Sequence, residues 1–221
     1  MRIPLDRLED IYSNPDAFIA EEEEEEEEKH IRPGRHSFMQ NALLKWHKGG
    51  ISADEARQEM IGKCEKFKNQ GELKRTIRKF DRYVQDYEAL DTNTRFTRLA
   101  VKVPLPKDVD RRFEIESQVR RLDKNSDGTY TAWLFYKERT NQHKNIHLPL
   151  LQSAVASRLN LDLNEIKIGI YCFADGSESI LQFSQTEVDA ARVELQLLLT
   201  KLAPLAEREP MPPQMVIDFD K

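Results

Sequence analysis

The sequence predicts a mixed α/β (α+β) fold in which a central mixed β-sheet is flanked by helices. Over residues 36–90 apolar side chains recur every three to four residues, which is the period of a helix. From about residue 94 the period changes to two, which is the period of a strand. Helical and strand patterns then follow one another to residue 203, and a chain of 221 residues can bury one substantial core.

The N-terminal part is expected to be helical. Residues 3–20 indicate a short helix, a turn at residues 13–15, and a second helix that begins at Pro15, because proline suits the first turn of a helix. A helical apolar pattern over residues 36–48 ends at Gly49-Gly50.

Two more helices are expected before the strands begin. Ser52 and Glu55 have the spacing of a capping box, which marks a helix start within residues 51–69. Residues 71–90 carry one apolar stripe and predict a third long helix.

The second half predicts the sheet. Three strands are expected at residues 96–105, 113–123 and 128–138, and a hairpin turn at residues 124–128 joins the last two. The remaining elements are a helix over 148–160, a strand pair around a turn at 174–176, a helix over 186–203 and an extended proline-rich tail. As domain organisation we expect an N-terminal helical part at 1–92, an α/β core at 93–204 and a tail at 205–221, in one compact domain.

Composition indicates a soluble, reduced, cytoplasmic protein with no membrane segment. No stretch approaches eighteen consecutive apolar residues, and the N-terminus lacks a secretory pattern. Cys64 and Cys172 match no metal-ligand spacing, so neither an iron–sulfur cluster nor a zinc knuckle is expected.

The net charge of −5 is dominated by an unbroken acidic run, Glu21 to Glu28, without which the remainder carries +3. Like-charge repulsion favours a disordered or solvated run. The alternative is that the run mimics nucleic-acid phosphate and competes for a basic groove elsewhere on the chain.

The segment from residue 63 to residue 83 offers the best nucleic-acid surface, because its basic groups can contact phosphates and its aromatic groups can stack on bases. The alternative is an ordinary solvated helix face, since acidic residues are interleaved. The residues expected to contact DNA on this helix are Lys74, Arg75, Arg78, Lys79 and Arg82. A second basic cluster comprises Arg111, Arg112, Arg120 and Arg121, of which Arg120 and Arg121 are also expected to bind nucleic acid.

Five segments in order resemble the RecB-type branch of the PD-(D/E)XK nuclease superfamily. They are YSNPDAF, GRHSFMQNALLKW, FEIESQVRRLD, DGTYTAWLFYKE and LPLLQSAVASRL. The resemblance implies a restriction-endonuclease-like core with an N-terminal helical elaboration, and hydrolysis of phosphodiesters with Mg²⁺ or Mn²⁺. Position by position it implies that His36 would bind the metal, that Lys137 and Gln152 would be catalytic, and that Tyr171 matches an aromatic residue of a late strand.

The same alignment lacks the two acids that hold the metal. Arg120 stands where the first aspartate belongs, and Phe135 stands where the acid before the lysine belongs. A guanidinium about 4 Å from a divalent ion, at an effective dielectric near 20, repels it by roughly 8 kcal/mol. Millimolar binding supplies only about 4 kcal/mol, so the metal site is expected to be lost unless Arg120 turns away.

A migrated carboxylate could rebuild the site. Glu116 shares the strand face of Arg120 but lies roughly 7 Å along the strand, and Glu138 points to the opposite face from Lys137. The surviving residues also have structural interpretations. His36 suits a helix interior, Gln152 suits hydrogen bonding at the sheet edge, and Tyr171 suits the core.

Three functional hypotheses follow. The first is a catalytically impaired nuclease-like protein that binds DNA or assists DNA processing. The second is an active Mg²⁺- or Mn²⁺-dependent DNA exonuclease with His36 and Glu116 as metal ligands. Its catalytic residues would be Lys137, Glu116 and Gln152. The third is a structural subunit that docks another protein through the acidic run or the tail at 205–221.

Overall fold

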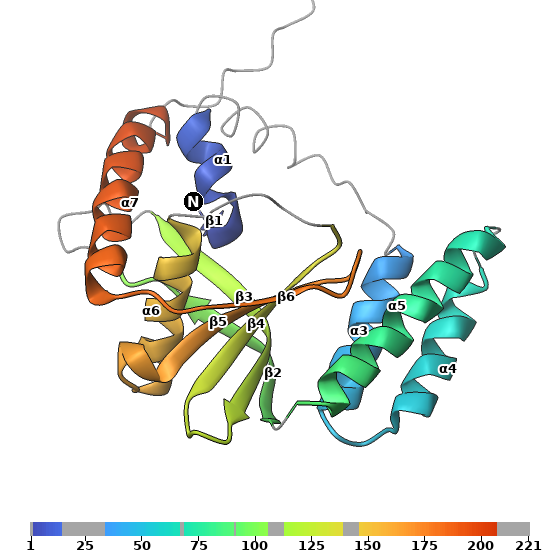
Figure 1. Ribbon diagram of the computed structural model, residues 1–221. Coiled ribbons are helices and arrows are strands. Elements are labelled where there is room, and N and C mark those ends of the chain that lie inside the picture. The colour runs from blue at the N-terminus through green and yellow to red at the C-terminus, as the bar shows by residue number, and fades with distance from the viewer. Residues whose placement is uncertain are drawn as a thin grey trace, which may run out of the picture.

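The structure, a computed structural model, describes residues 2–14, 34–66, 69–90, 92–105, 113–138 and 146–206. The acidic run, the predicted helix after Pro15, Arg111 and Arg112, and residues 207–221 of the tail lie outside these ranges. The predicted fold class is confirmed: helices flank a mixed β-sheet (Figure 1).

The N-terminal segment differs from the sequence prediction in its first residues. Strand β1 (Arg2–Pro4) precedes a short 3-10 helix η1 (Leu5–Arg7) and helix α1 (Leu8–Ser13). Ile3 in β1 pairs in parallel with Ile115 and is fully buried. A three-residue strand has no detectable period of its own, and for that reason only the helix was predicted.

Three helices follow as predicted: α3 (Arg35–His47), α4 (Ala53–Cys64) and α5 (Gln70–Glu88). The predicted capping box forms, with the Ser52 backbone N–H donating to Glu55 Oε2 at 2.7 Å and the Glu55 backbone N–H donating to Ser52 Oγ at 3.2 Å. Helix α5 begins after Asn69, whose side-chain oxygen accepts from the Glu72 backbone N–H.

The remaining elements are β2 (Thr92–Lys102), β3 (Glu114–Asn125), β4 (Tyr130–Tyr136), α6 (His147–Leu159), the 3-10 helix η2 (Leu163–Glu165), β5 (Ile166–Cys172), β6 (Glu178–Leu181) and α7 (Gln185–Ala206). The strands form a six-stranded sheet with the order β1-β3-β4-β5-β6, in which β2 also pairs with β3. The pairs β1–β3 and β4–β5 are parallel, and the pairs β2–β3, β3–β4 and β5–β6 are antiparallel.

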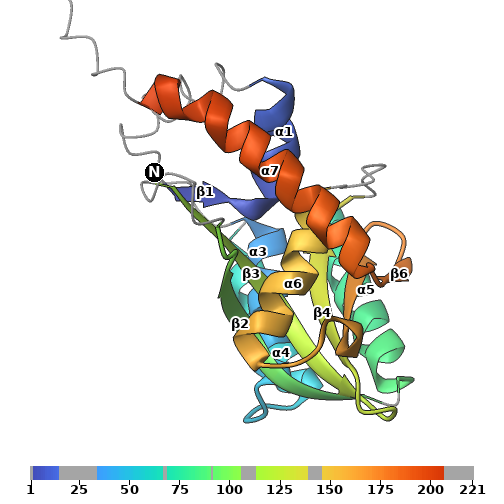
Figure 2. The ribbon, with the colours of Figure 1, turned by 90° about the vertical axis from the view of Figure 1, so that its left-hand side faces the viewer.

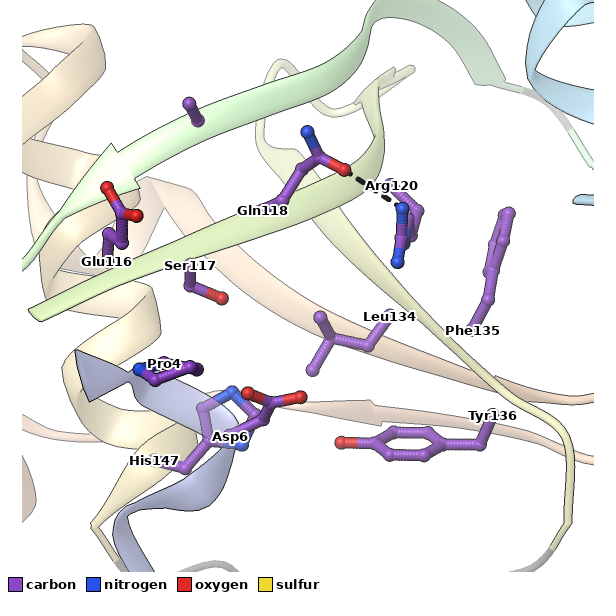
Figure 3. Close-up of a pocket in the computed structure, with 11 residues that line it drawn as sticks. Pro4, Asp6, Glu116, Ser117, Gln118, Arg120, Leu134, Phe135, Tyr136 and His147 are labelled. Carbon is purple, nitrogen blue, oxygen red and sulfur yellow. Dashed lines mark hydrogen bonds between the residues drawn. The ribbon is translucent and has the colours of Figure 1, made fainter. Parts of the chain in front are cut away.

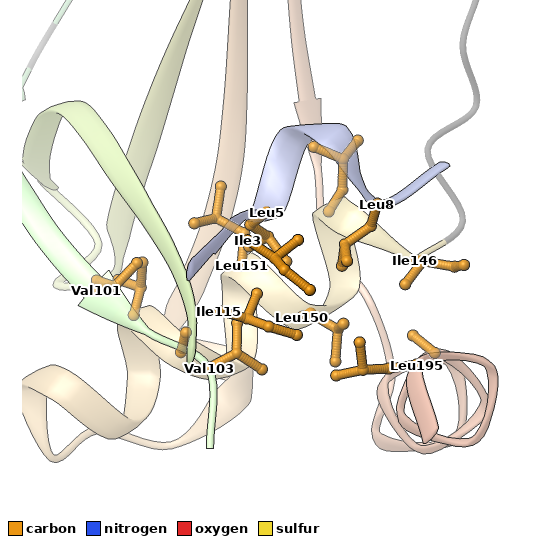
Figure 4. Close-up of a cluster of buried hydrophobic side chains, with 14 of the residues drawn as sticks. Ile3, Leu5, Leu8, Val101, Val103, Ile115, Ile146, Leu150, Leu151 and Leu195 are labelled. Atoms are coloured by element: carbon orange, nitrogen blue, oxygen red, sulfur yellow. The ribbon is translucent and has the colours of Figure 1, made fainter. Parts of the chain in front are cut away.

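Each face of the sheet has its own apolar cluster. On one face α6, α7 and the N-terminal segment bury leucine and isoleucine side chains against β2 and β3 (Figure 4). On the other face α3, α4 and α5 pack around Trp133, Tyr171 and Phe173. Figure 1 shows these two helical layers on opposite sides, and Figure 2 shows α7 running beside α1 and α6.

The alternation of side chains in β3 shifts by one residue at Arg120. Val119 and Leu122 both enter the cluster of α6 and α7, although they are three residues apart. Across from this point, Arg98 in β2 lies between the partners of Val119 and Arg121 and has a positive φ of 58°. A non-glycine residue with this backbone marks a local irregularity of the strand pair. The shift turns Arg121 toward the helices α3 to α5.

No helix within the described ranges combines the length and the apolar character that a membrane crossing requires.

Candidate functional site

Strands β3 and β4 separate after a short paired region. Their register runs from Lys124 opposite Tyr130 to Arg121 opposite Trp133. Beyond Arg121 the two strands border a pocket with a volume of about 400 Å³, which β1, η1 and the first residue of α6 close on the other side (Figure 3). We call this the fork pocket, and its lining includes Asp6, Glu116, Ser117, Gln118, Arg120, Leu134, Phe135, Tyr136 and His147.

The fork pocket carries charges of both signs. Asp6 and Glu116 provide carboxylates, and Arg120 provides a guanidinium whose Nη1 donates to Gln118 Oε1 at 2.9 Å. Burial and the nearby Arg98 lower the pKa of Arg120, whereas the Asp6 carboxylate raises it. The group is therefore partly removed from water, which strengthens its interaction with any polar ligand.

A second pocket lies where α3 and α5 approach the end of β4. It has a volume of about 450 Å³, and we call it the basic pocket. Its lining residues are Gly34, Arg35, His36, Met39, Glu72, Arg75, Thr76, Lys79 and Lys137, which is four cations against one carboxylate. Arg35 Nη1 donates to that carboxylate, Glu72 Oε2, at 2.9 Å.

The positive charge of the basic pocket acts directly on His36. Burial and the nearby Lys79, Lys137 and Arg120 lower the pKa of His36 to about 4, so the ring is neutral at physiological pH. Gln40 Nε2 lies 3.0 Å from His36 Nε2. With the amide nitrogen as donor, His36 Nε2 accepts and the ring proton sits on Nδ1.

The residues of the basic pocket do not fit a divalent metal. Mg²⁺ and Mn²⁺ prefer carboxylate, carbonyl and water oxygens, whereas the groups that face His36 are cations. Glu116, the other predicted ligand, lines the fork pocket and not the basic pocket. Across the described ranges, no group of three or more His, Cys, Asp or Glu side chains is placed to hold a metal ion.

Two predicted catalytic residues have different surroundings. Lys137 follows β4, is exposed, and makes a loose 3.6 Å pair with the equally exposed Glu138. Gln152 is fully buried in α6, where its amide donates to the Leu163 and Phe183 carbonyls and accepts from the Phe183 backbone N–H. The structural interpretation of Gln152 therefore fits, because its amide is occupied by the backbone of Leu163 and Phe183 and does not line the basic pocket.

Arg120 and Phe135 occupy the two positions at which the resemblance implies a metal-binding acid. Arg120 faces the fork pocket, and Phe135 lies on its edge (Figure 3). The Phe135 ring also packs at 5.4 Å from the rings of Tyr83 and Phe173. Tyr171, expected in the core, is buried and donates a hydrogen bond to Asp86 at 2.8 Å.

The basic residues of α5 lie on the surface as predicted. Lys74, Arg75, Arg78 and Arg82 are exposed, and Lys79 is half-buried beside the basic pocket. The Arg82 stem packs over the turn at Gly176, where an added Cβ would meet its Cδ at 2.5 Å. This row continues the positive charge of the basic pocket along the helix.

The prediction that Arg121 binds nucleic acid is wrong, because the shift in β3 buries its side chain to 2% exposure. Its Nη2 lies 2.8 Å from Asp123 Oδ2 and its Nη1 donates to the Tyr83 hydroxyl. The guanidinium also stacks on Tyr87 and Trp133, 4.6 and 4.7 Å from their ring centres. A guanidinium that is this deeply buried cannot reach a phosphate.

Sequence reasoning missed the rest of this buried network. Thr94 Oγ1 donates to Asp123 Oδ1 at 2.9 Å, and His47 Nε2 lies 2.8 Å from the Tyr83 hydroxyl. Burial and the Arg121 charge lower the pKa of His47 to about 2, so it is a neutral structural histidine. The available signal was the pair of opposite charges, Arg121 and Asp123, two residues apart on one face of a strand.

Comparisons with known proteins do not identify the chain. No family model and no curated protein matches it. Among solved structures, the crystal structure of SSO0001 is similar with a TM-score of 0.30 and 8% identity, over 88% of this chain and 85% of that chain. A similarity of this size carries no argument about fold or function, so the nuclease resemblance stays a prediction.

Proposed function

We propose that this chain is a cytoplasmic nuclease-like protein of the PD-(D/E)XK type, RecB-like branch, that binds DNA without hydrolysing it and assists DNA processing. The observation that carries the proposal is the basic pocket, whose lining combines four cations with a neutral His36 and one carboxylate that is paired with Arg35. The metal-binding acids of the resemblance are replaced by Arg120 and Phe135.

Phosphate groups fit this arrangement for electrostatic reasons. Arg75 and Lys79 make no ion pair within the described part of the chain, and Lys137 has only its loose pair with Glu138. A unit charge about 4 Å from an opposite charge gains about 4 kcal/mol at an effective dielectric of 20. The pocket that repels a divalent cation therefore attracts a phosphate.

The surface of α5 extends the same interaction. Lys74, Arg78 and Arg82 are exposed beyond the pocket, along a helix of 19 residues that is about 28 Å long. Such a row can contact several phosphates of one strand, which gives affinity without reading sequence.

The test is the salt dependence of DNA binding, measured by fluorescence anisotropy in EDTA. The slope of log K against log salt is negative, and each lost phosphate contact makes it shallower by about 0.7 for a single strand. Replacing Arg75, Lys79 and Lys137 together by alanine should make the slope shallower by about 2. The same variant should bind about a hundredfold more weakly at 0.1 M salt.

The matched control is Lys167→Ala, which also removes a cation, but one that pairs with Asp127 at 3.0 Å at the hairpin turn. The control should leave the slope unchanged. A wild-type protein that does not bind DNA, or metal-dependent cleavage that disappears in Lys137→Ala, would overturn the proposal.

A further inference from the structure

We propose that the fork pocket holds one unpaired nucleobase of a DNA strand whose phosphates contact the basic pocket, so that the protein selects single-stranded over double-stranded DNA. The inference rests on the proposed DNA binding and adds the form of DNA and a base site to it. The base site is the fork pocket, which the proposed phosphate contacts do not occupy.

The charges of the two pockets favour different parts of a nucleotide. In the fork pocket two carboxylates, Asp6 and Glu116, oppose the single cation Arg120, so a phosphate is disfavoured there. In the basic pocket four cations oppose the single carboxylate of Glu72, so a phosphate is favoured. A neutral, hydrogen-bonding part of the same ligand fits the fork pocket instead.

The lining of the fork pocket matches the chemistry of a base. Leu134, Phe135 and Tyr136 contribute apolar surface to the lining. Arg120 and Ser117 provide donors, and Gln118 and the carboxylates provide acceptors, which suit the mixed donor and acceptor edge of a base. Figure 3 shows these side chains on the separating strands β3 and β4 and on the N-terminal segment. Its volume of about 400 Å³ lies in the range of pockets that hold small organic ligands.

The two pockets are close enough to share one strand. Two ring contacts connect them, because the Phe173 ring lies 5.4 Å from His36 in the basic pocket and 5.4 Å from Phe135 in the fork pocket. The charge of Arg120 also reaches His36, where it lowers the histidine pKa. One nucleotide and its neighbour can therefore contact both pockets.

A base enters the fork pocket only if it is unpaired. In a duplex each base is stacked and paired, and its extrusion costs free energy that a single strand does not pay. Selection for single strands therefore follows from the use of this pocket.

The first measurement uses the wild-type full chain and three labelled probes of equal length in EDTA: a single strand, its duplex and a single strand made of abasic nucleotides. We expect the single strand to bind at least about tenfold more tightly than either other probe, since contacts to one unstacked base contribute about this factor. Equal affinity for the single strand and either other probe would refute the base site.

The second measurement fills the pocket without changing its charge. Ser117→Phe should remove the advantage of the single strand and leave duplex affinity unchanged. Ser179→Phe, at an exposed position of strand β6 outside the pocket lining, should change neither. A Ser117→Phe protein that keeps the full single-strand preference would overturn the inference. DNA binding that lacks strand preference would refute the inference alone, whereas absence of DNA binding would refute the proposed function.

Discussion

Replacing Arg121 by methionine should destabilise the protein strongly and leave the affinity of the folded protein for DNA unchanged. Arg121 and Asp123 are 2% and 0% exposed and lie 2.8 Å apart. Methionine keeps much of the apolar contact but leaves the Asp123 carboxylate buried without its cation. Removing one partner of a buried ion pair costs about 3–5 kcal/mol, which for a domain of this size lowers Tm by about 6–20 °C.

The assay is urea unfolding followed by circular dichroism, with DNA affinity measured on the same preparations. The double variant Arg121→Met with Asp123→Leu removes both charges and should recover much of the lost stability, since apolar groups can replace a buried pair at little cost. The reasoning is refuted if Arg121→Met lowers the free energy of unfolding by less than about 1 kcal/mol. It is also refuted if the folded variant binds DNA more weakly than the wild-type protein.

Three further predictions concern single side chains. The ring of His36 should titrate near pH 4 in NMR spectra of the folded protein, well below the ordinary value of 6.5. As the pH falls, His36 of the unfolded chain takes up a proton near pH 6.5, whereas His36 of the folded protein does so only near pH 4. The contribution of His36 to stability is therefore present above pH 6.5 and is lost as the pH falls toward 4. Titration of the folded protein near pH 6.5 would contradict the burial of the ring. Gln152→Ala should cost about 2–4 kcal/mol in urea unfolding, since it leaves buried backbone groups of Phe183 unpaired, and a neutral result would mean that water replaces the amide. Lys79→Ala alone should weaken single-strand binding about fivefold at 0.1 M salt with unchanged stability, and an unchanged affinity would exclude Lys79 from the phosphate contacts.

Local patterns predicted most of the secondary structure. The capping box at Ser52, the apolar stripe of α5 and the hairpin turn before Gly128 each determine structure within a few residues of themselves. Each appears in the structure where the sequence placed it. The strand β1 was missed because its three residues are fixed only by pairing with β3, more than a hundred residues away.

The candidate site was predicted in part. Strand alternation placed Glu116, Gln118 and Arg120 on one face, and all three line the fork pocket. The alternation then fails at the irregularity opposite Arg98, so neighbouring arginines that look equivalent in sequence have opposite environments. The separation of His36 and Glu116 into two pockets depends on how α3 packs against the sheet, and a linear pattern does not contain this information.

The most direct test is to incubate the purified protein with a labelled single-stranded oligonucleotide in EDTA and, in parallel, in millimolar MnCl₂, and to measure both binding and the length of the oligonucleotide. The account predicts binding of similar strength in both buffers and an oligonucleotide that remains intact. Binding that requires manganese, or shortening of the oligonucleotide that Lys137→Ala abolishes, would contradict it.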